Sequence, residues 1–328
     1  MNLSGAGLPF AGGPLHFAQC RLFGRNIPAE ILGLEAAERR APGELESLRT
    51  PRPAIAGLEP AKSGPGPLIM GIVNVTPDSF HDGGRLRPAA AIAHGRALAG
   101  AGAAILDVGG ESTRPGAREV PVDEELERIM PVIEALAGDG LAVSVDTRKA
   151  AVMTAAVNAG ARMINDVTAL RHDPGSMACA AKLAVPVVLM HSRGTPETMQ
   201  SMTHYDDLIM DVFDDLSARL ADCLAAGLSR DNLLLDPGLG FAKMPEQSAA
   251  LLRGMAHFHA LGCPLLIGAS RKGFVGKLTG AAATEDRLPG SLAAAMWAAQ
   301  QGAAVLRVHD VAETAQTMAI FRSLCYKG

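Results

Sequence analysis

Eight short apolar runs recur along the chain with stretches of helical spacing between them, and this alternation restricts the fold more than any other feature. The runs lie at 68–75, 103–108, 141–145, 162–164, 185–190, 232–235, 264–267 and 303–308. Runs of Val, Ile and Leu without polar alternation are typical of parallel strands that are buried on both faces. The sequence therefore predicts an α/β fold, a TIM (β/α)8 barrel.

One of the intervening stretches, 123–137, carries apolar side chains on a single helical face, and Asp123 is its expected N-cap. An open doubly wound sheet built from the same elements is the alternative fold. No G-x-G-x-x-G motif follows the first apolar run, which counts against the dinucleotide-binding form of that sheet.

Residues 1–67 differ from the rest of the chain in their density of proline and glycine. Proline fixes φ and lacks an N–H group, so we expect this segment to lack a continuous core of its own. One helix is predicted at 29–40, and 57–67 is the expected link. The predicted organisation is thus an N-terminal extension, 1–67, followed by a barrel domain, 68–328.

Charge and composition exclude several classes of protein. A formal net charge of −4 does not provide the basic face that nucleic-acid binding needs. No apolar run reaches the roughly 18–20 residues of a membrane span, and no signal-peptide pattern opens the chain. Five cysteines are far apart and never form a C-x-x-C pair. We therefore expect a cytoplasmic protein with neither a disulfide framework nor a zinc site, and with no nucleic-acid or membrane partner.

Polar side chains follow every one of the eight apolar runs. They are Asn74, Asp107, Asp146, Asn165 with Asp166, His191, Asp236, the trio Ser270, Arg271 and Lys272, and Arg307 with His309. In a barrel the C-terminal ends of all strands meet at one mouth, so these side chains would face one cavity. A single Asp after a strand is as often the N-cap of the next helix, but the set as a whole predicts an active site.

The residue types indicate what such a mouth would bind. Carboxylates and an amide at Asp146, Asn165 and Asp236 suit a flat heterocycle that is rich in N–H groups. Arg307 and His309 follow the eighth run, where barrels often hold a phosphate. Asn74 offers a carbonyl oxygen to a hard cation such as Mg²⁺, which commonly binds few protein ligands plus phosphate oxygens.

Two segments that follow the first and second runs, 76–84 and 109–117, are longer than ordinary βα turns and rich in glycine. Such loops in a compact domain are often lids. Phe80 is expected to cover a ligand, and the hydroxyls of Ser112 and Thr113 lie beside Arg114, where they could bind an anion.

At these residues the chain resembles the dihydropteroate synthase family. The matching stretches are MGIVNVTPDSFHDGG (70–84), LDVGGESTRPGA (106–117), SVDTRK (144–149), INDV (164–167), LMHSRGTPETMQ (189–200), LLLDPGLGF (233–241), GASRKGFVG (268–276) and LRVHDV (306–311). The resemblance implies a TIM barrel that joins 4-aminobenzoate to (7,8-dihydropterin-6-yl)methyl diphosphate. The products would be 7,8-dihydropteroate, a folate precursor, and diphosphate. It also implies a cytoplasmic homodimer that sulfonamides inhibit by mimicking 4-aminobenzoate.

The resemblance also implies roles for individual residues. Catalytic roles fall on Asp107, Asp146, Asp236 and Lys272. Binding of the pterin diphosphate falls on Thr113, Asp146, Asn165, Asp236, Lys272, Arg307, Val308 and His309. Binding of 4-aminobenzoate falls on Phe80, Pro115, Ser270 and Arg271, and Asn74 would hold Mg²⁺. Leu239 and Ala242 depart from the family pattern, so the loop after the sixth apolar run is where the backbone geometry could differ from that of the family.

Two other functions remain open. One is a methyltransferase-type pterin domain of similar fold that binds a methylated folate, and ESTRPG and RVHD speak against it. The other is a paralogue that binds pterin without catalysis, which the intact Asn74, Lys272, Arg307 and His309 disfavour.

Overall fold

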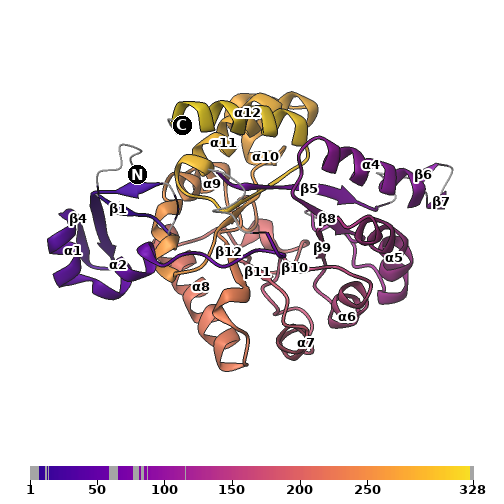
Figure 1. Ribbon diagram of the computed structural model, residues 1–328, viewed down its shortest axis with the longest axis horizontal. Helices are drawn as coiled ribbons and strands as arrows, with labels where there is room; N and C mark the ends of the chain where they lie inside the picture. Colours follow the sequence, from indigo (N-terminus) through magenta and orange to yellow (C-terminus); the bar gives the residue numbers. More distant parts are fainter. Residues whose placement is uncertain are drawn as a thin grey trace.

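The computed structural model describes residues 7–11, 13, 15–58, 66–76, 81–82, 85–86, 88–114 and 116–325. Its main body is a barrel of eight parallel strands inside a ring of helices (Figure 1). The strands are β5 (Leu68–Asn74), β8 (Ile105–Gly109), β9 (Val143–Asp146), β10 (Met163–Asp166), β11 (Val187–Met190), β12 (Leu233–Asp236), β13 (Leu266–Ile267) and β14 (Val305–Val308). A parallel bridge between Leu235 and Leu265 joins the two ends of the sheet. The predicted TIM barrel is confirmed.

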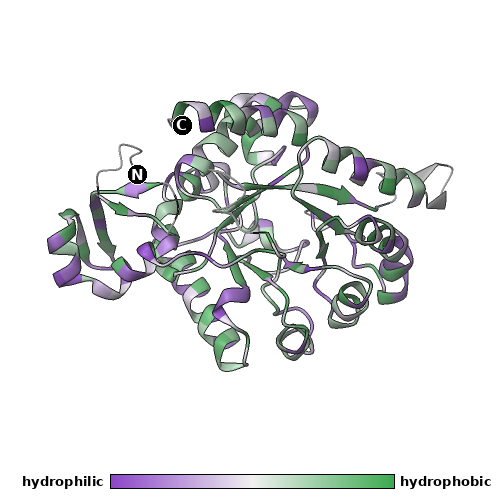
Figure 2. Ribbon diagram, viewed as in Figure 1, coloured by the Kyte–Doolittle hydropathy of each residue, from purple (hydrophilic) through white to green (hydrophobic). Residues whose placement is uncertain are grey.

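The ring of helices covers the outer face of the sheet, and the strands are predominantly apolar (Figure 2). Its members are α4 (Pro88–Gly100), α5 (Val122–Gly138), α6 (Ala150–Asn158), α7 (Ser176–Leu183), α8 (Leu208–Ala225), α9 (Pro245–Arg253), α10 (Gly273–Thr279), α11 (Leu288–Gln300) and α12 (Val311–Cys325). No helix in the described part of the chain is long and apolar enough to cross a membrane.

Helix α5 contains the predicted stretch 123–137, but Asp123 is not its N-cap. Pro121 holds that position in extended conformation, without a side-chain bond. Proline's fixed φ suits the entry to a helix. Asp123 instead lies in the first turn, where its charge favours the N-terminal end of the helix dipole.

The N-terminal segment forms a small folded unit, which corrects two expectations. Its elements are β1 (Leu8–Pro9), β2 (His16–Phe17), β3 (Gln19–Gly24), β4 (Ile27–Gly33), α1 (Leu34–Arg40) and α2 (Pro42–Arg49). The helix predicted at 29–40 begins at Leu34, because the preceding residues pair with β3 across a turn in which Asn26 has φ 59°. The unit also has an apolar cluster of its own, which contains Phe10, Phe17, Leu32, Ala37 and Leu45.

This unit packs against the side of the barrel near α8 (Figure 1). Arg25 forms ion pairs with Asp211 at 2.6 Å and Asp214 at 2.8 Å, both on α8. The Phe10 ring meets the ring of His259 edge-on, with centroids 4.6 Å apart, in the 3₁₀ helix η3 (Met255–Leu261). The extension therefore has both charged and aromatic contacts with the barrel.

The chain then crosses the barrel (Figure 1) and makes a tight turn at the end where the strands begin. Ile55 and Leu58 exchange backbone hydrogen bonds of 2.7 and 2.8 Å around Ala56 and Gly57, whose φ values are 52° and 80°. The Ile55 side chain is 1% exposed and packs into a cluster at the N-terminal ends of the strands, which includes Leu68, Ile105 and Met163. This turn plugs the end of the barrel opposite the polar mouth.

We expect Ile55→Ala to lower the free energy of unfolding by roughly 2–5 kcal/mol, because it leaves a cavity under the barrel. Urea unfolding followed by the fluorescence of the single tryptophan, Trp297, measures this change. Ile31→Ala, at a side chain that is 67% exposed in the same extension, is the matched control and should change it by no more than about 0.5 kcal/mol. Equal effects of the two substitutions would contradict the plug.

Candidate active site

The mouth of the barrel is centred on one guanidinium held between two carboxylates. Arg307 on β14 donates from Nε to Asp107 Oδ2 and from Nη2 to Asp146 Oδ2, each at 2.6 Å. Asn165 lies beside Asp146 in the sheet register, and its Nδ2 donates to Asp107 Oδ2 at 2.9 Å. Four predicted residues from strands β8, β9, β10 and β14 therefore form one hydrogen-bonded cluster.

Burial controls the charge states in this cluster. It raises the pKa of Asp146 to about 7; Arg307 opposes the shift and Asp107 adds to it. Burial also opposes the charge on Arg307, but the two carboxylates hold its pKa above the ordinary value. Asp107 Oδ1 is buried and accepts no hydrogen bond from the described residues. A donor on a ligand would relieve the cost of that unpaired acceptor.

A second carboxylate–cation pair completes the mouth. Asp236 ends β12 and accepts from the backbone N–H of Gly238 at 2.7 Å. Lys272 donates to the carbonyl oxygen of Leu239 at 2.6 Å, and its Nζ lies 4.7 Å from the centroid of the Phe241 ring. Burial lowers the pKa of Lys272 to about 8, which Asp236 opposes. Burial raises the pKa of Asp236, which Lys272 opposes.

The ends of β13 and β14 are tied together on one side of the mouth. Ser270 Oγ lies 3.1 Å from His309 Nδ1 and also accepts from the His309 backbone N–H at 3.1 Å. Arg271, at φ 56°, forms an ion pair with Asp310. Burial, aided by the charge of Arg307, lowers the pKa of His309 to about 4. His309 is therefore neutral near pH 7.

The balance of charges decides what the centre of the mouth can bind. Three carboxyl groups, Asp107, Asp146 and Asp236, lie there with two basic side chains, Arg307 and Lys272. A buried site with this many carboxyl oxygens favours a ligand edge that donates several N–H groups over an anion. Arg307 already uses Nε and Nη2 on carboxylates, so its predicted role in anion binding falls to its remaining nitrogen.

Two of the strand-end residues serve other purposes. Asp166 accepts from the backbone N–H of Thr168 at 2.7 Å and of Leu170 at 3.0 Å, so it fixes the turn after β10. His191 Nδ1 lies 2.8 Å from Lys243 Nζ. Asp166 is thus a turn residue, which is neither a site role nor the helix N-cap considered for a single strand-end Asp.

The remaining predicted residues lie around the rim or outside the described chain. Thr113 lines a cavity of about 410 Å³ together with Arg148, Arg193 and Phe241. Arg193 donates to the carbonyl oxygen of His204 and lies over the ring of Tyr205. Val308 is buried on β14. The predicted residues Phe80 and Pro115 lie outside the described residues.

A buried lysine braces the loop after β12, and sequence reasoning did not assign it a role. Lys243 donates to the carbonyl oxygen of Phe241 at 2.9 Å and contacts His191 Nδ1. Burial lowers the pKa of Lys243 to about 7 and that of His191 to about 2, so the histidine is the neutral acceptor. Ala242, where the family pattern has glycine, adopts φ 51°. The departure is therefore accommodated in a left-handed conformation, and the loop keeps its contacts.

Asn74 is partly buried at the end of β5 and is the predicted Mg²⁺ ligand. No group of three or more His, Cys, Asp or Glu side chains suited to a metal occurs among the described residues. A single amide oxygen fits an ion that binds mainly through water and substrate phosphate oxygens, which is the usual arrangement for Mg²⁺. Asn74 therefore fits a Mg²⁺ ion whose other ligands are water and substrate oxygens.

Comparison with known proteins gives one consistent result. The family model described as pterin binding enzyme matches residues 70–309. The dihydropteroate synthase of Escherichia coli is 47% identical over 256 residues, which cover 77% of this chain and 90% of the relative.

Two solved structures of the Xanthomonas albilineans dihydropteroate synthase are similar in fold. The one with 4-aminobenzoic acid has a TM-score of 0.76 and 50% identity, covering 80% of this chain and 94% of that one. The one in complex with 7,8-dihydropteroate has a TM-score of 0.73 and 47% identity, covering 80% and 95%. The chain shares both its fold and much of its sequence with these enzymes, and it belongs to the pterin-binding enzyme family.

Proposed function

We propose that this chain is a transferase that condenses 4-aminobenzoate with (7,8-dihydropterin-6-yl)methyl diphosphate, giving 7,8-dihydropteroate and diphosphate for tetrahydrofolate synthesis. The observation that carries the proposal is the convergence of Asp146, Asn165, Asp236 and Lys272 with Arg307 at one barrel mouth. Identity of 47% over nine-tenths of a dihydropteroate synthase supports the same reaction.

The carboxylates hold the pterin and favour positive charge on it. Asp146 and Asp236 accept N–H bonds from the ring edge, and Asn165 supplies an amide between them. As the C–O bond breaks, positive charge develops on the methylene carbon and is delocalised over the dihydropterin ring. Two ionised carboxylates interact more strongly with this positively charged transition state than with the neutral ring of the bound substrate. Lys272 opposes the rise that burial causes in the pKa of Asp236 and so favours its ionised form.

The leaving diphosphate lies toward the rim. The remaining Arg307 nitrogen, neutral His309 and the Thr113 hydroxyl donate to its oxygens, and Asn74 holds Mg²⁺ beside it. When bound, Mg²⁺ neutralises charge that develops on the leaving diphosphate. The backbone of Val308 fixes the direction in which its neighbours, Arg307 and His309, project from β14.

The arylamine attacks the methylene carbon as a neutral nucleophile, and a released proton passes to solvent or to diphosphate. Ser270 and Arg271 form one side of its site, and Phe80 and Pro115 enclose it from the two loops. Closure of these loops positions the amine and excludes water, which competes for the same carbon. Sulfonamides compete for this place.

We further propose a cytoplasmic homodimer. Helices α11 and α12 pack against each other, and Met296, Trp297 and Ile320 are 38%, 42% and 59% exposed on them. Large apolar side chains that gather on neighbouring helices are typical of an interface. This face supports pairing of two copies.

Incubation of the purified protein with both substrates and Mg²⁺ tests the reaction directly. Formation of dihydropteroate, followed by chromatography, is the expected result, and a sulfonamide should reduce it competitively with 4-aminobenzoate. Pterin binding without product would indicate the non-catalytic paralogue. Binding of methylated folate without synthesis would indicate the methyltransferase-type domain.

Asp236→Asn should lower kcat/KM for the pterin diphosphate by about 100-fold while the fold is kept, because it removes a charge that opposes the developing cation. Steady-state kinetics measure this. Asp123→Asn, at the exposed start of α5, makes the same chemical change and should leave kcat/KM unaltered. An unchanged value in Asp236→Asn would remove this carboxylate from the mechanism.

Pterin affinity should depend on pH through Asp146. Its pKa is raised to about 7, so below pH 7 the group is protonated and loses its charge. Because the ring edge binds the ionised form, affinity should fall by up to about tenfold per pH unit on the acid side. Calorimetric titration with 6-hydroxymethyl-7,8-dihydropterin, which carries no phosphate, measures this. If Asp146→Asn showed the same fall in affinity below pH 7, the assignment of this pH dependence to Asp146 would be contradicted.

Removal of Mg²⁺ by a chelator should abolish most product formation, and added Mg²⁺ should restore it. Asn74→Ala should raise the Mg²⁺ concentration needed for the half-maximal rate by roughly tenfold, because it removes the only predicted protein ligand. Asn158→Ala, at the end of α6, is the control. An unchanged Mg²⁺ requirement in Asn74→Ala would show that this residue does not hold the ion.

A further inference from the structure

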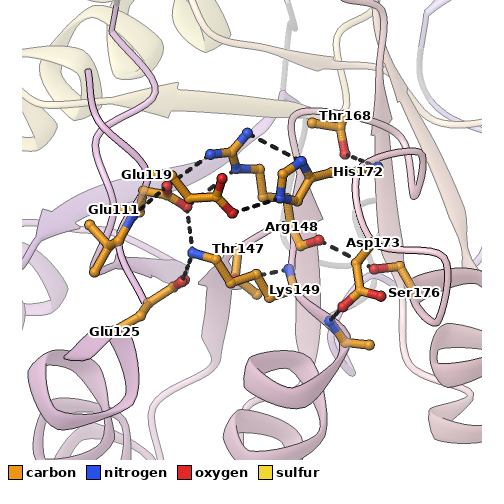
Figure 3. A network of polar contacts seen from close by, with 12 residues as sticks. Glu111, Glu119, Glu125, Thr147, Arg148, Lys149, Thr168, His172, Asp173 and Ser176 are labelled. Atoms are coloured by element: carbon orange, nitrogen blue, oxygen red, sulfur yellow. Dashed lines mark hydrogen bonds and ion pairs between the residues drawn. The ribbon is translucent and has the colours of Figure 1, made fainter. Parts of the chain in front are cut away.

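A buried network of charged side chains lies beside the mouth, between the loops that follow β8 and β9 (Figure 3). Glu111 accepts from Arg148 Nη2 at 2.9 Å and from Lys149 Nζ at 2.8 Å. Lys149 also donates to Glu125 on α5 at 2.5 Å. Two carboxylates and two cations thus balance each other away from solvent.

The Glu111 carboxylate is the centre of this network. Its side chain is 3% exposed, and despite burial its pKa lies below the usual range because Arg148 and Lys149 hydrogen-bond to it. It also accepts from the backbone N–H of Val120 at 3.1 Å. Since Glu111 and Val120 are the two ends of one long loop, this carboxylate closes the loop at its base.

The base of the loop has further restraints. Arg128 on α5 donates to the carbonyl oxygen of Gly110 at 2.6 Å. At the far end Glu119 lies 3.1 Å from His172 Nε2, and His172 Nδ1 lies 3.4 Å from Arg148 Nη1 (Figure 3). The segment between Glu111 and Glu119, which contains Thr113, is therefore held at both ends.

Position along the chain links the network to the reacting groups. Arg148 follows Asp146 by two residues, and Glu111 precedes Thr113 by two. The Glu111–Arg148 ion pair therefore joins the loop that carries Thr113 to the strand end that carries Asp146. Neither Glu111 nor Arg148 is among the residues assigned to substrate.

We infer that Glu111 is a positioning residue that fixes Thr113 and its neighbours over the diphosphate of the bound pterin. This inference rests on the proposed function and deepens it. A buried ion pair adds little to stability compared with well-packed apolar groups, so the cluster is better explained by the fixed geometry it gives the loop. Its effect should be confined to interactions with the diphosphate.

The test is Glu111→Gln, which keeps the shape of the side chain and removes its charge. We expect kcat/KM for the pterin diphosphate to fall by about 100-fold, as for a misplaced contact in an organised site. The dissociation constant of 6-hydroxymethyl-7,8-dihydropterin should change by less than about twofold, because that ligand uses the Asp146 and Asp236 side of the mouth. A role limited to general folding would alter both quantities together.

Two further variants separate position from stability. Glu127→Gln, on the exposed side of α5, is the matched control and should behave as the native protein. The double variant Glu111→Gln with Arg148→Met removes one buried cation along with the carboxylate and leaves the Lys149–Glu125 ion pair intact, so it should regain thermal stability that the single variant loses. It should not regain activity, because the link from Arg148 to the loop is still absent.

Recovery of both stability and activity in the double variant would overturn the inference, as would native kinetics in Glu111→Gln. Equal losses of pterin and pterin diphosphate binding would overturn it too. If the native protein itself makes no dihydropteroate, the proposed function fails, whereas a failure confined to the Glu111 variants leaves that function intact.

Discussion

The Arg307 guanidinium, held between Asp107 and Asp146, is the interaction on which the rest of the site depends. Because the barrel closes, β14 lies next to β5, and β8 and β9 follow on the other side of β5. The long Arg307 side chain on β14 spans this distance and reaches the carboxylates of Asp107 and Asp146. Burial and the neighbouring Asp107 raise the pKa of Asp146 to about 7, and Arg307 opposes a further rise. The charge of Arg307 therefore keeps a fraction of Asp146 ionised near neutral pH.

The same arrangement accounts for the division of the substrate. In the proposed reaction, a centre with three carboxyl groups and two cations receives the N–H-rich ring, and the anionic leaving group is directed to the rim. Hydroxyls, a neutral histidine and the partly buried Asn74 lie there. The proposed function thus places pterin and phosphate in regions that differ in charge. The ion pairs and hydrogen bonds of Glu111 connect the mouth to the loop that carries Thr113.

The barrel could be predicted because its strands are buried on both faces, which leaves uninterrupted apolar runs such as 187–190. The residues at the mouth could be predicted because strand ends place them there whatever the intervening loops do. Local competition was harder to read. The segment before Leu34 has the composition of a helix, but pairing with β3 decides its conformation. Asp166 looked like a site residue and instead fixes a turn.

Contacts that depend on distant parts of the chain could not be read from the sequence. Glu111 meets Arg148 across 37 residues, and Lys243 meets His191 across 52. Neither pair has a spacing that a helix or strand would impose. The available signal was that two basic residues, Arg148 and Lys149, follow the strand-end Asp146 by two and three positions, which indicates only proximity to the mouth.

The central claim is that the carboxylates of this mouth bind one pterin ring. A crystal structure of the protein with 6-hydroxymethyl-7,8-dihydropterin tests it most directly. The account predicts the N–H edge of the ring within hydrogen-bond distance of Asp146 and Asp236, with Arg307 still paired to Asp107. A ring bound elsewhere, or bound with these two carboxylates turned away from it, would contradict the account.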